Sequence, residues 1–360
     1  MNRRARTVII TGASAGIGRA IAARFAQAGD RVGLIARDQT ALEAVQRELL
    51  ASGARDVEWE AVDVCDAAAL FAAADRLERR LGLMDIWIND AMETVFSTVA
   101  DIDPTEFRRV TEVTYLGFVH GTMAALKSMR LRRRGRIIQI GSALAYRGIP
   151  LQSAYCGAKH AMRGFTNSLR AELLHEKSPV TVSVIELPAV NTPQFDWARA
   201  HIPHAPRPMG VPVEPEVVAD AVFRVAEGSS REYWLGWQTI LTILGNSVVP
   251  AYLDRYLARK AVAGQQTSTP LPAGRDDNLD HPVTALHRTR GSFSVGSSLH
   301  AMLIDGELAR AACVIIGATL FLVAGAAVAR RRRPRSPRPP NSLRHETVRT
   351  LRARRAVPLP

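Results

Sequence analysis

The chain has 360 residues, a formal net charge of +13 and an apolar fraction of 47%, which is enough for one large domain or two small ones. From Arg330 to the end, eleven arginines face one acid, Glu346, so this tail carries +10 and the preceding 329 residues carry only +3. A nearly neutral body with a basic tail argues against a nucleic-acid-binding fold. Three scattered cysteines exclude a disulfide framework or a zinc site and favour a reducing compartment.

Apolar, strand-like runs alternate with helical periodicity along residues 7–236. The runs are almost continuously apolar, which is typical of a parallel sheet covered by helices on both faces. We therefore expect an α/β, doubly wound fold with a seven-stranded parallel sheet. The expected strands are 7–11, 31–36, 57–62, 85–89, 136–141, 180–187 and 231–236, and the expected helices lie near 17–28, 39–51, 67–81, 104–130, 153–176 and 214–227.

The remainder of the chain changes character after Gly236. A mixed helical segment extends to about residue 262, which closes the expected main domain at 1–262. Residues 264–300 are rich in Ser, Thr, Pro, Gly and Asp, so we expect a flexible polar linker over 263–306. An uncharged run at 311–329 predicts an apolar helix over 307–330, and the basic, proline-rich end predicts a disordered tail over 331–360.

A glycine-rich loop, TGASAGIG, joins the first expected strand to the first helix. Gly12 permits a tight turn, Gly16 lets a backbone approach a pyrophosphate, and Gly18 lets helix and strand pack closely. The start of the helix then offers backbone N–H groups and the positive end of its dipole to phosphate. A strand before the loop and a helix after it make this a dinucleotide-binding pattern rather than a glycine-rich turn without a ligand.

The stretch SAYCGAKHAM places Tyr155 and Lys159 four residues apart, on one face of the helix expected at 153–176. Such a pair can be ordinary helix surface. It can also be a proton-transfer pair, because a nearby cation lowers the pKa of a phenol from its ordinary value of about 10.

These motifs, in this order and on these elements, resemble the single-domain Rossmann type of the short-chain dehydrogenase/reductase family. The third motif is Ser142, at the end of the fifth strand and thirteen residues before Tyr155. The resemblance covers about residues 5–236 and implies that 1–262 is a catalytic domain. It implies that Tyr155 is the general acid/base, that Lys159 lowers the pKa of the tyrosine and holds the nicotinamide ribose, and that Ser142 orients the substrate oxygen. It further implies an enzyme that acts on CH–OH donors, a small alcohol or carbonyl substrate, and a homodimer or homotetramer.

The resemblance also implies a set of cofactor contacts. At the end of the second strand, where family members that prefer NAD carry an acid, this chain has Ala36 and then Arg37. An arginine pairs with a 2′-phosphate, so NADP(H) is the expected cofactor and NAD(H) the alternative, although Arg37 also fits a solvated loop residue. The implied contacts are Thr11, Gly12, Ser14, Gly16, Ile17, Gly18, Arg37, Asp63, Val64, Asn89, Ala91, Tyr155, Lys159, Pro188, Val190 and Thr192.

Two positions depart from the family pattern. The fourth strand ends Asn89-Asp90-Ala91-Met92, where the family has Asn-Asn-Ala-Gly. Thr114 stands where the family carries an asparagine that orders a water between the lysine and solvent, so we include Thr114 among the catalytic candidates. A chain that has lost activity is the alternative interpretation of these departures.

The loop after the sixth strand carries bulky apolar residues, Phe195, Trp197 and Ile202. They indicate a hydrophobic alcohol or carbonyl substrate, or else they pack the loop onto its own domain. His201 and His204 lie in the same loop, but nothing in the sequence completes a metal site, and none is expected.

The run at 311–329 is about 28 Å long as a helix, close to the ~30 Å core of a bilayer. Its basic C-terminal flank prefers the cytoplasmic side, and the apolar stretch at the start of the chain is too short for a signal peptide. The segments on both sides of the run therefore favour the cytoplasmic side of the membrane, which conflicts with a helix that spans the membrane once. The alternatives are a helix that lies on the membrane surface and a helix that packs against a partner. We expect a cytoplasmic protein that associates with the cytoplasmic side of a membrane through 311–329 and the basic tail.

The second functional hypothesis is a catalytically silent Rossmann-type regulatory protein at a membrane. No specific nucleic acid is expected as a partner.

Overall fold

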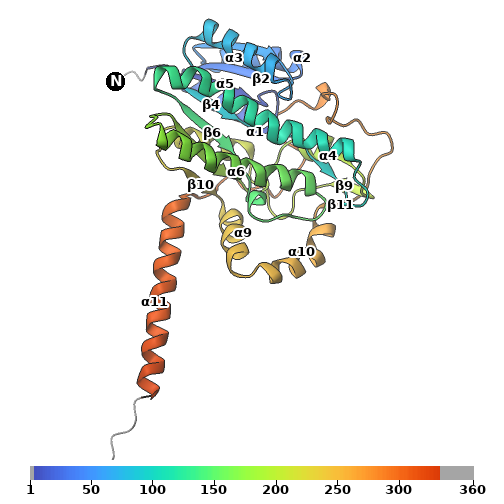
Figure 1. Cartoon of the computed structure of the whole chain (residues 1–360). Helices are drawn as coiled ribbons and strands as arrows, with labels where there is room; N and C mark the ends of the chain where they lie inside the picture. Colours follow the sequence, from blue (N-terminus) through green and yellow to red (C-terminus); the bar gives the residue numbers. More distant parts are fainter. Residues whose placement is uncertain (1–3, 333–360) are drawn as a thin grey trace, which may run out of the picture. The chain divides into compact units, whose positions relative to one another are not determined.

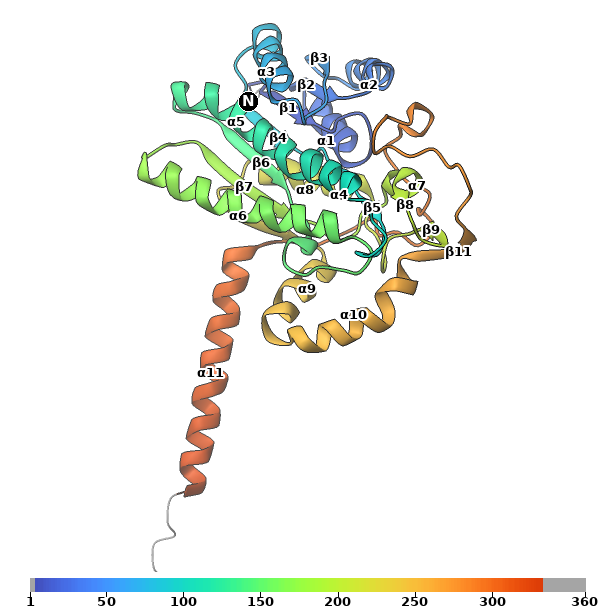
Figure 2. The same cartoon turned by 45° about the vertical axis from the view of Figure 1, so that its right-hand side comes forward.

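A computed structural model describes residues 4–332 and divides the chain into two units, Met1–Ala309 and Arg310–Pro360. In the first unit, helices cover both faces of a central sheet (Figures 1 and 2) with the strand order β12-β10-β7-β6-β4-β1-β2-β3. All seven expected parallel strands are confirmed, with ends that shift by no more than one residue. They are β1 (Thr7–Thr11), β2 (Arg31–Ala36), β3 (Asp56–Ala61), β4 (Ile86–Asn89), β6 (Arg136–Ile140), β7 (Thr181–Glu186) and β10 (Glu232–Leu235).

Successive side chains along each strand point to opposite faces of the sheet and pack into two cores, one on each face. Ile10 and Leu34 lie in one core and Ile9 and Ile35 in the other, and all four are fully buried. The flanking helices are α1 (Gly16–Gln27), α2 (Gln39–Ala51), α3 (Ala67–Leu81), α6 (Ser153–His175) and α8 (Pro215–Val225). The helix expected near 104–130 is divided into α4 (Pro104–Thr111), a π-helical turn (Glu112–Leu116) and α5 (Gly117–Arg132).

The sheet has an eighth strand that the sequence did not indicate. β12 (Leu303–Asp305) pairs antiparallel with β10, with Leu303 opposite Leu235. A second strand of the expected linker, β11 (Gln266–Pro270), pairs with β9 (His204–Pro206). The structure therefore differs from the predicted linker over 263–306, which lies within the first unit. Backbone hydrogen bonds and ion pairs hold this segment in place. Such contacts do not require regularly spaced apolar residues, so no periodic pattern in the sequence predicts them.

The described chain also contains the short helix α7 (Gln194–Trp197) and the helices α9 (Trp237–Val248), α10 (Pro250–Gly264) and α11 (Gly306–Arg332). By length and composition alone, Gly306–Ala324 could cross a bilayer. Within it, residues 311–319 and 321–324 are exposed. The predicted disordered tail lies, from residue 333 onwards, outside the described residues.

Candidate active site

A cavity of about 910 Å³ opens at the carboxyl ends of the parallel strands. Its wall includes Gly12 after β1, Arg37 after β2, Ala91 after β4, Ser142 after β6 and Pro188 after β7. In open α/β sheets this edge is where ligands bind, because the loops that follow the strands converge there.

Most of the residues predicted from the sequence line this cavity. They are Gly12, Ser14, Gly16, Ile17, Arg37, Asp63, Val64, Ala91, Ser142, Tyr155, Lys159, Pro188, Val190 and Thr192. Three residues of the predicted contact set, Thr11, Gly18 and Asn89, and the catalytic candidate Thr114 are not among the residues that line the wall. The Thr11 hydroxyl accepts hydrogen bonds from the N–H groups of the wall residues Asp90 and Ala91 at 3.2 and 3.3 Å, whereas the Asn89 side chain bonds Trp87, Thr122 and Gln139 in the interior.

The glycine loop has a shape that only glycine allows. Gly12 has a φ of +75°, and a Cβ there would lie 2.8 Å from the backbone of Ala91. A Cβ on Gly18 would lie 2.3 Å from the carbonyl oxygen of Gly12. Helix α1 begins at Gly16 after Ala15, whose side chain makes no capping hydrogen bond, and the Gly16 N–H donates to the carbonyl oxygen of Arg288 at 3.0 Å. The other N–H groups at the start of the helix suit an anionic group. The cradle therefore fits the pyrophosphate of a dinucleotide.

Ser142, Tyr155 and Lys159 come together as the motif spacing predicted. The Ser142 hydroxyl lies close enough to the Tyr155 phenol to lower the pKa of that phenol by hydrogen bonding. The Lys159 Nζ donates to the carbonyl oxygen of Ile140 at 2.8 Å and lies 5.5 Å from the ring centroid of Tyr155. Ser142 follows β6, whereas Tyr155 and Lys159 lie one turn apart on α6, so the strand end and the helix face bring the three side chains to one part of the cavity wall.

Burial of this trio acts against the expected lowering of the Tyr155 pKa by Lys159. Burial raises the pKa of the Tyr155 phenol, and only the hydrogen bond from Ser142 opposes this shift among its main causes. Burial also lowers the pKa of Lys159 to about 8, against the opposing charges of Asp90 and Glu186. Desolvation outweighs the cation here because it disfavours the charged form of both groups.

Two buried acids beside the trio were not among the predicted site residues. Glu186, the last residue of β7, accepts a hydrogen bond from the backbone N–H of Ser142 at 2.6 Å, and burial raises its pKa to about 8. Burial likewise raises the pKa of Asp90 to about 7. A signal for Glu186 was present in the sequence, since an acid interrupts the apolar run VSVIEL.

Thr114 lies in the π-helical turn and is fully engaged with the loop after β4. Its hydroxyl donates to the carbonyl oxygen of Glu93 at 2.9 Å and accepts from the N–H of Glu93 at 3.0 Å. π-helical turns within α-helices are frequent at functional sites. Thr114 therefore positions the Glu93 loop, and its place in a proton relay remains a prediction.

We expect Thr114→Val to lower turnover by several-fold and to raise the KM of the cofactor, because both hydrogen bonds to the Glu93 backbone are lost at nearly constant volume. Steady-state kinetics over a range of pH check this. Thr114→Asn restores polar contacts and is expected to retain turnover. A valine variant with unchanged kcat, cofactor KM and pH profile would show that Thr114 serves only helix packing.

The β2 end of the cavity carries a dense ion-pair network. Arg37 pairs with the buried Glu93 at 2.6 Å and donates to the carbonyl oxygens of Asn278 and Leu279 at 2.5 and 3.2 Å. Burial raises the pKa of Glu93 to about 8, although the charge of Arg37 opposes the shift. Asp63 pairs with Arg109 at 2.6 Å. Arg37 is thus at the cavity wall as predicted, but it is already held by groups that the sequence did not reveal.

The opposite end of the cavity is apolar. Leu241 of α9 and Leu253, Tyr256 and Leu257 of α10 line it, together with Met209. Phe195 and Trp197 also face the cavity, whereas Ile202 packs in a buried cluster around Phe96. Among residues 4–332, no group of three or more His, Cys, Asp or Glu side chains lies together in a way that would hold a metal ion.

The family model described as short chain dehydrogenase matches residues 6–202 of the chain. The chain belongs to the short-chain dehydrogenase/reductase family. The "Uncharacterized oxidoreductase YxnA" of Bacillus subtilis is 32% identical over 269 residues, which cover 74% of this chain and 75% of that protein. "Dehydrogenase/reductase SDR family member 7B" of Bos taurus is 36% identical over 190 residues, which cover 51% of this chain and only 58% of that protein.

Solved structures of short-chain dehydrogenases are also similar to this chain. An alcohol dehydrogenase from Thermococcus sibiricus in complex with 5-hydroxy-NADP is 25% identical, has a TM-score of 0.56, and the match covers 64% of this chain and 96% of that one. A metagenomic short-chain oxidoreductase in complex with NADP is 27% identical with a TM-score of 0.54, over 64% of this chain and 97% of that one. As a member of the family, this short-chain dehydrogenase/reductase is an oxidoreductase that acts on CH–OH donors with a nicotinamide cofactor.

Proposed function

We propose that this short-chain dehydrogenase/reductase is an NADP(H)-dependent enzyme that interconverts an alcohol and a carbonyl group on an apolar substrate. The observation that carries this proposal is the meeting of Ser142, Tyr155 and Lys159 in one cavity. That cavity has the glycine cradle at one end and an apolar wall from α9 and α10 at the other. NADP complexes of two similar structures and the position of Arg37 support the choice of cofactor.

The nicotinamide, when bound, supplies or accepts the hydride. Ser142 holds the substrate oxygen by a hydrogen bond, and Tyr155 exchanges the proton with that oxygen. The buried phenol of Tyr155 keeps its proton at neutral pH, which is the form that reduction of a carbonyl requires. Lys159 places a positive charge near the ring and stabilises the phenolate after the proton leaves. Glu186 positions Ser142 through its backbone N–H.

Consumption of NADPH by the full chain with a panel of aldehydes and ketones of increasing chain length tests this function. Turnover is expected to rise with the apolar size of the substrate, because the wall that Leu241, Leu253 and Leu257 form excludes water. A chain that binds NADPH but turns over no member of the panel, in either direction, would instead support the silent regulatory protein.

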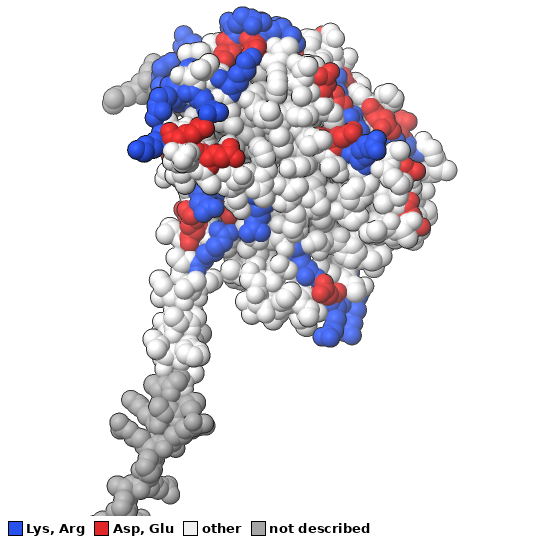
Figure 3. Space-filling model, in the orientation of Figure 1, with Lys and Arg blue, Asp and Glu red and all other residues white. Residues whose placement is uncertain are grey.

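We also propose that the protein associates with a membrane. The described part of α11 beyond its first turns carries large exposed apolar side chains, among them Val314, Ile315 and Ile316, and no charge is visible there (Figure 3). In the first unit, α9 and α10 expose Trp237 and Tyr252. Together with the basic tail, these features suit the cytoplasmic face of an anionic bilayer.

The full chain is expected to float with vesicles that contain anionic lipid, and Ile315→Asp is expected to reduce the floating fraction at least about fivefold, because a charge in the apolar run opposes burial in lipid. Cosedimentation or flotation measures this. Leu131→Asp, at an exposed position on α5, serves as the control and should float like the wild type. If Ile315→Asp floats to the same extent as the wild type, this run does not contact the membrane.

A further inference from the structure

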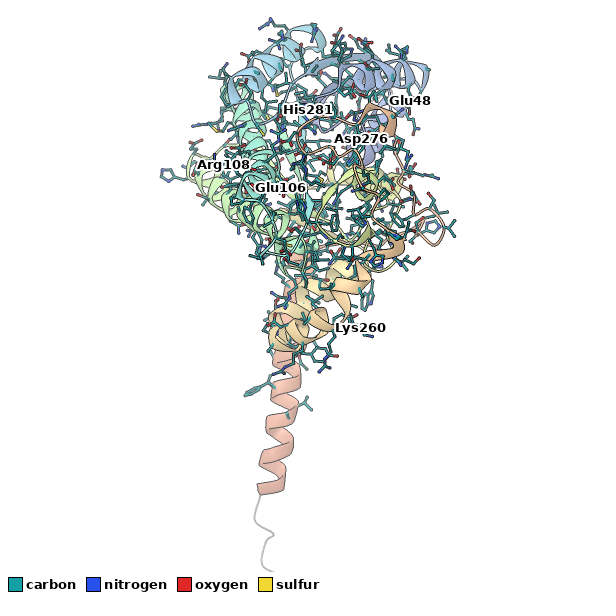
Figure 4. The ribbon with its side chains drawn as sticks, turned by 90° about the vertical axis from the view of Figure 1, so that its right-hand side faces the viewer. Glu48, Glu106, Arg108, Lys260, Asp276 and His281 are labelled. Carbon is teal, nitrogen blue, oxygen red and sulfur yellow. The ribbon has the colours of Figure 1, made fainter. Side chains whose placement is uncertain are left out.

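A segment outside the part matched by the family model contributes to the wall of the cavity. We call residues 275–291 the strap. In Figure 4, Asp276 and His281 of the strap lie between Glu48 of α2 and Glu106 of α4. Asn278, Pro282 and His287 form part of the cavity wall. The family model ends at residue 202, so the strap is an addition to the matched domain.

Both ends of the strap are anchored to the loop after β7. At one end, the Arg275 guanidinium donates to the carbonyl oxygen of Asp196 at 2.8 Å and also to those of Phe195 and Ala198. At the other end, the N–H of Gly291 donates to the carbonyl oxygen of Asn191 at 3.1 Å. The strap is therefore a loop with two fixed ends and a middle that crosses the cavity.

The middle of the strap contacts the loops expected to hold the nucleotide. The Thr284 hydroxyl donates to the Asp38 carboxylate, and the Nδ1 of His287 lies 3.2 Å from the same group. The N–H of Gly16 donates to the carbonyl oxygen of Arg288 at 3.0 Å. With the bonds from Arg37 to Asn278 and Leu279, the strap touches both the glycine loop and the end of β2.

One apolar anchor joins the strap to the reaction centre. Leu279 is 1% exposed and packs with Val95, Val110 and Ala154, and Tyr155 lies against the same cluster. The His287 ring also makes an edge-to-face contact with Trp197, with ring centroids 5.4 Å apart. The other contacts described above are polar, and Thr284 and Arg288 are exposed. A segment held by few buried apolar contacts opens at a lower free-energy cost than the core.

We propose that the strap is part of the nucleotide site: it closes over the adenosine and pyrophosphate end of the bound dinucleotide and must open for the nucleotide to enter or leave. Asn278, Pro282 and His287 provide the outer wall, while the cavity that they enclose remains large enough for a ligand. Other lining residues, from α9 and α10, form the proposed substrate end. Nucleotide exchange and substrate exchange thus use different openings. This inference rests on the proposed dinucleotide function.

Two measurements on the full chain test the strap. Hydrogen exchange of peptides from 278–291 is expected to slow at least about fivefold when NADPH binds, because the ligand holds the strap closed. In stopped-flow experiments, Arg275→Met is expected to speed NADPH dissociation about tenfold, since it removes three hydrogen bonds from an anchor that does not line the cavity. Thr284→Val, which removes the bond to Asp38, is expected to speed dissociation about threefold.

Two control variants carry the same chemical changes away from the strap contacts: Arg259→Met on the exposed face of α10 and Thr269→Val on β11. Both should release NADPH at the wild-type rate. NADPH binding with unchanged exchange at 278–291 and equal dissociation from the Arg275 and Thr284 variants would overturn the strap proposal alone. Absence of any NADPH or NADH binding would instead refute the dinucleotide function on which it rests.

Discussion

Replacement of Tyr155 by phenylalanine should lower kcat by about a thousandfold or more, while the Kd for NADPH stays within about twofold of the wild-type value. The ring that packs near Lys159 is retained, and only the hydroxyl that bonds Ser142 and exchanges the proton is lost. Transfer of hydride to the carbonyl would then leave an alkoxide without a proton donor, and this raises the barrier of the chemical step alone.

Turnover under saturating NADPH and substrate, together with nucleotide titration by fluorescence, separates the two effects. Tyr146→Phe is the matched control, because the Tyr146 hydroxyl bonds Glu232 and Tyr146 does not line the cavity. This control should retain turnover within about tenfold. A Tyr155→Phe variant that turns over at a rate like that of the control would refute the assignment of the proton donor.

The second large effect concerns the choice between the two nicotinamide cofactors. Arg37→Ala should weaken the binding of NADPH by at least about tenfold and that of NADH by no more than about threefold, because only NADPH has a 2′-phosphate to pair with a guanidinium. The measurement with NADH also controls for any effect of the Arg37→Ala substitution on the strap. Arg37 holds the carbonyl oxygens of Asn278 and Leu279, and a loosened strap would affect both nucleotides alike.

Isothermal titration of each nucleotide measures the two dissociation constants. Arg37→Lys is the conservative variant, since it keeps the charge but loses the forked geometry that also pairs with Glu93. It should recover part of the preference for NADPH. Equal losses for NADPH and NADH in Arg37→Ala would show that Arg37 serves the strap and the Glu93 network and does not recognise the phosphate.

Local sequence patterns determined the seven parallel strands and the residues of the glycine loop. Strand 7–11 and helix α1 could be placed because continuous apolar runs and helical periodicity record burial within a few neighbouring residues. The spacing of Tyr155 and Lys159 predicted a shared helix face for the same local reason. Ser142 needed the family resemblance as well, because its distance from Tyr155 depends on how β6 and α6 meet.

Only the tertiary structure decided the electrostatics of the site. The raised pKa of Tyr155 follows from desolvation and from Asp90 and Glu186, which approach from β4 and β7. The engagement of Arg37 with Glu93 and with the strap likewise joins residues up to 242 positions apart in the sequence. Such contacts depend on how several strand ends converge, and no local period in the sequence records that convergence.

The sequence by itself thus determined the sheet, the glycine cradle and the helical pair of Tyr155 and Lys159, since each is set by residues within a turn or a strand of one another. The tertiary structure decided that Asn278, Pro282 and His287 join the cavity wall and that β12 pairs with β10 at the edge of the sheet. Polar side chains and backbone groups hold these segments, and such groups find partners anywhere in the fold. Which of these groups pair depends on which segments lie close together in the folded chain, and composition and periodicity do not predict that.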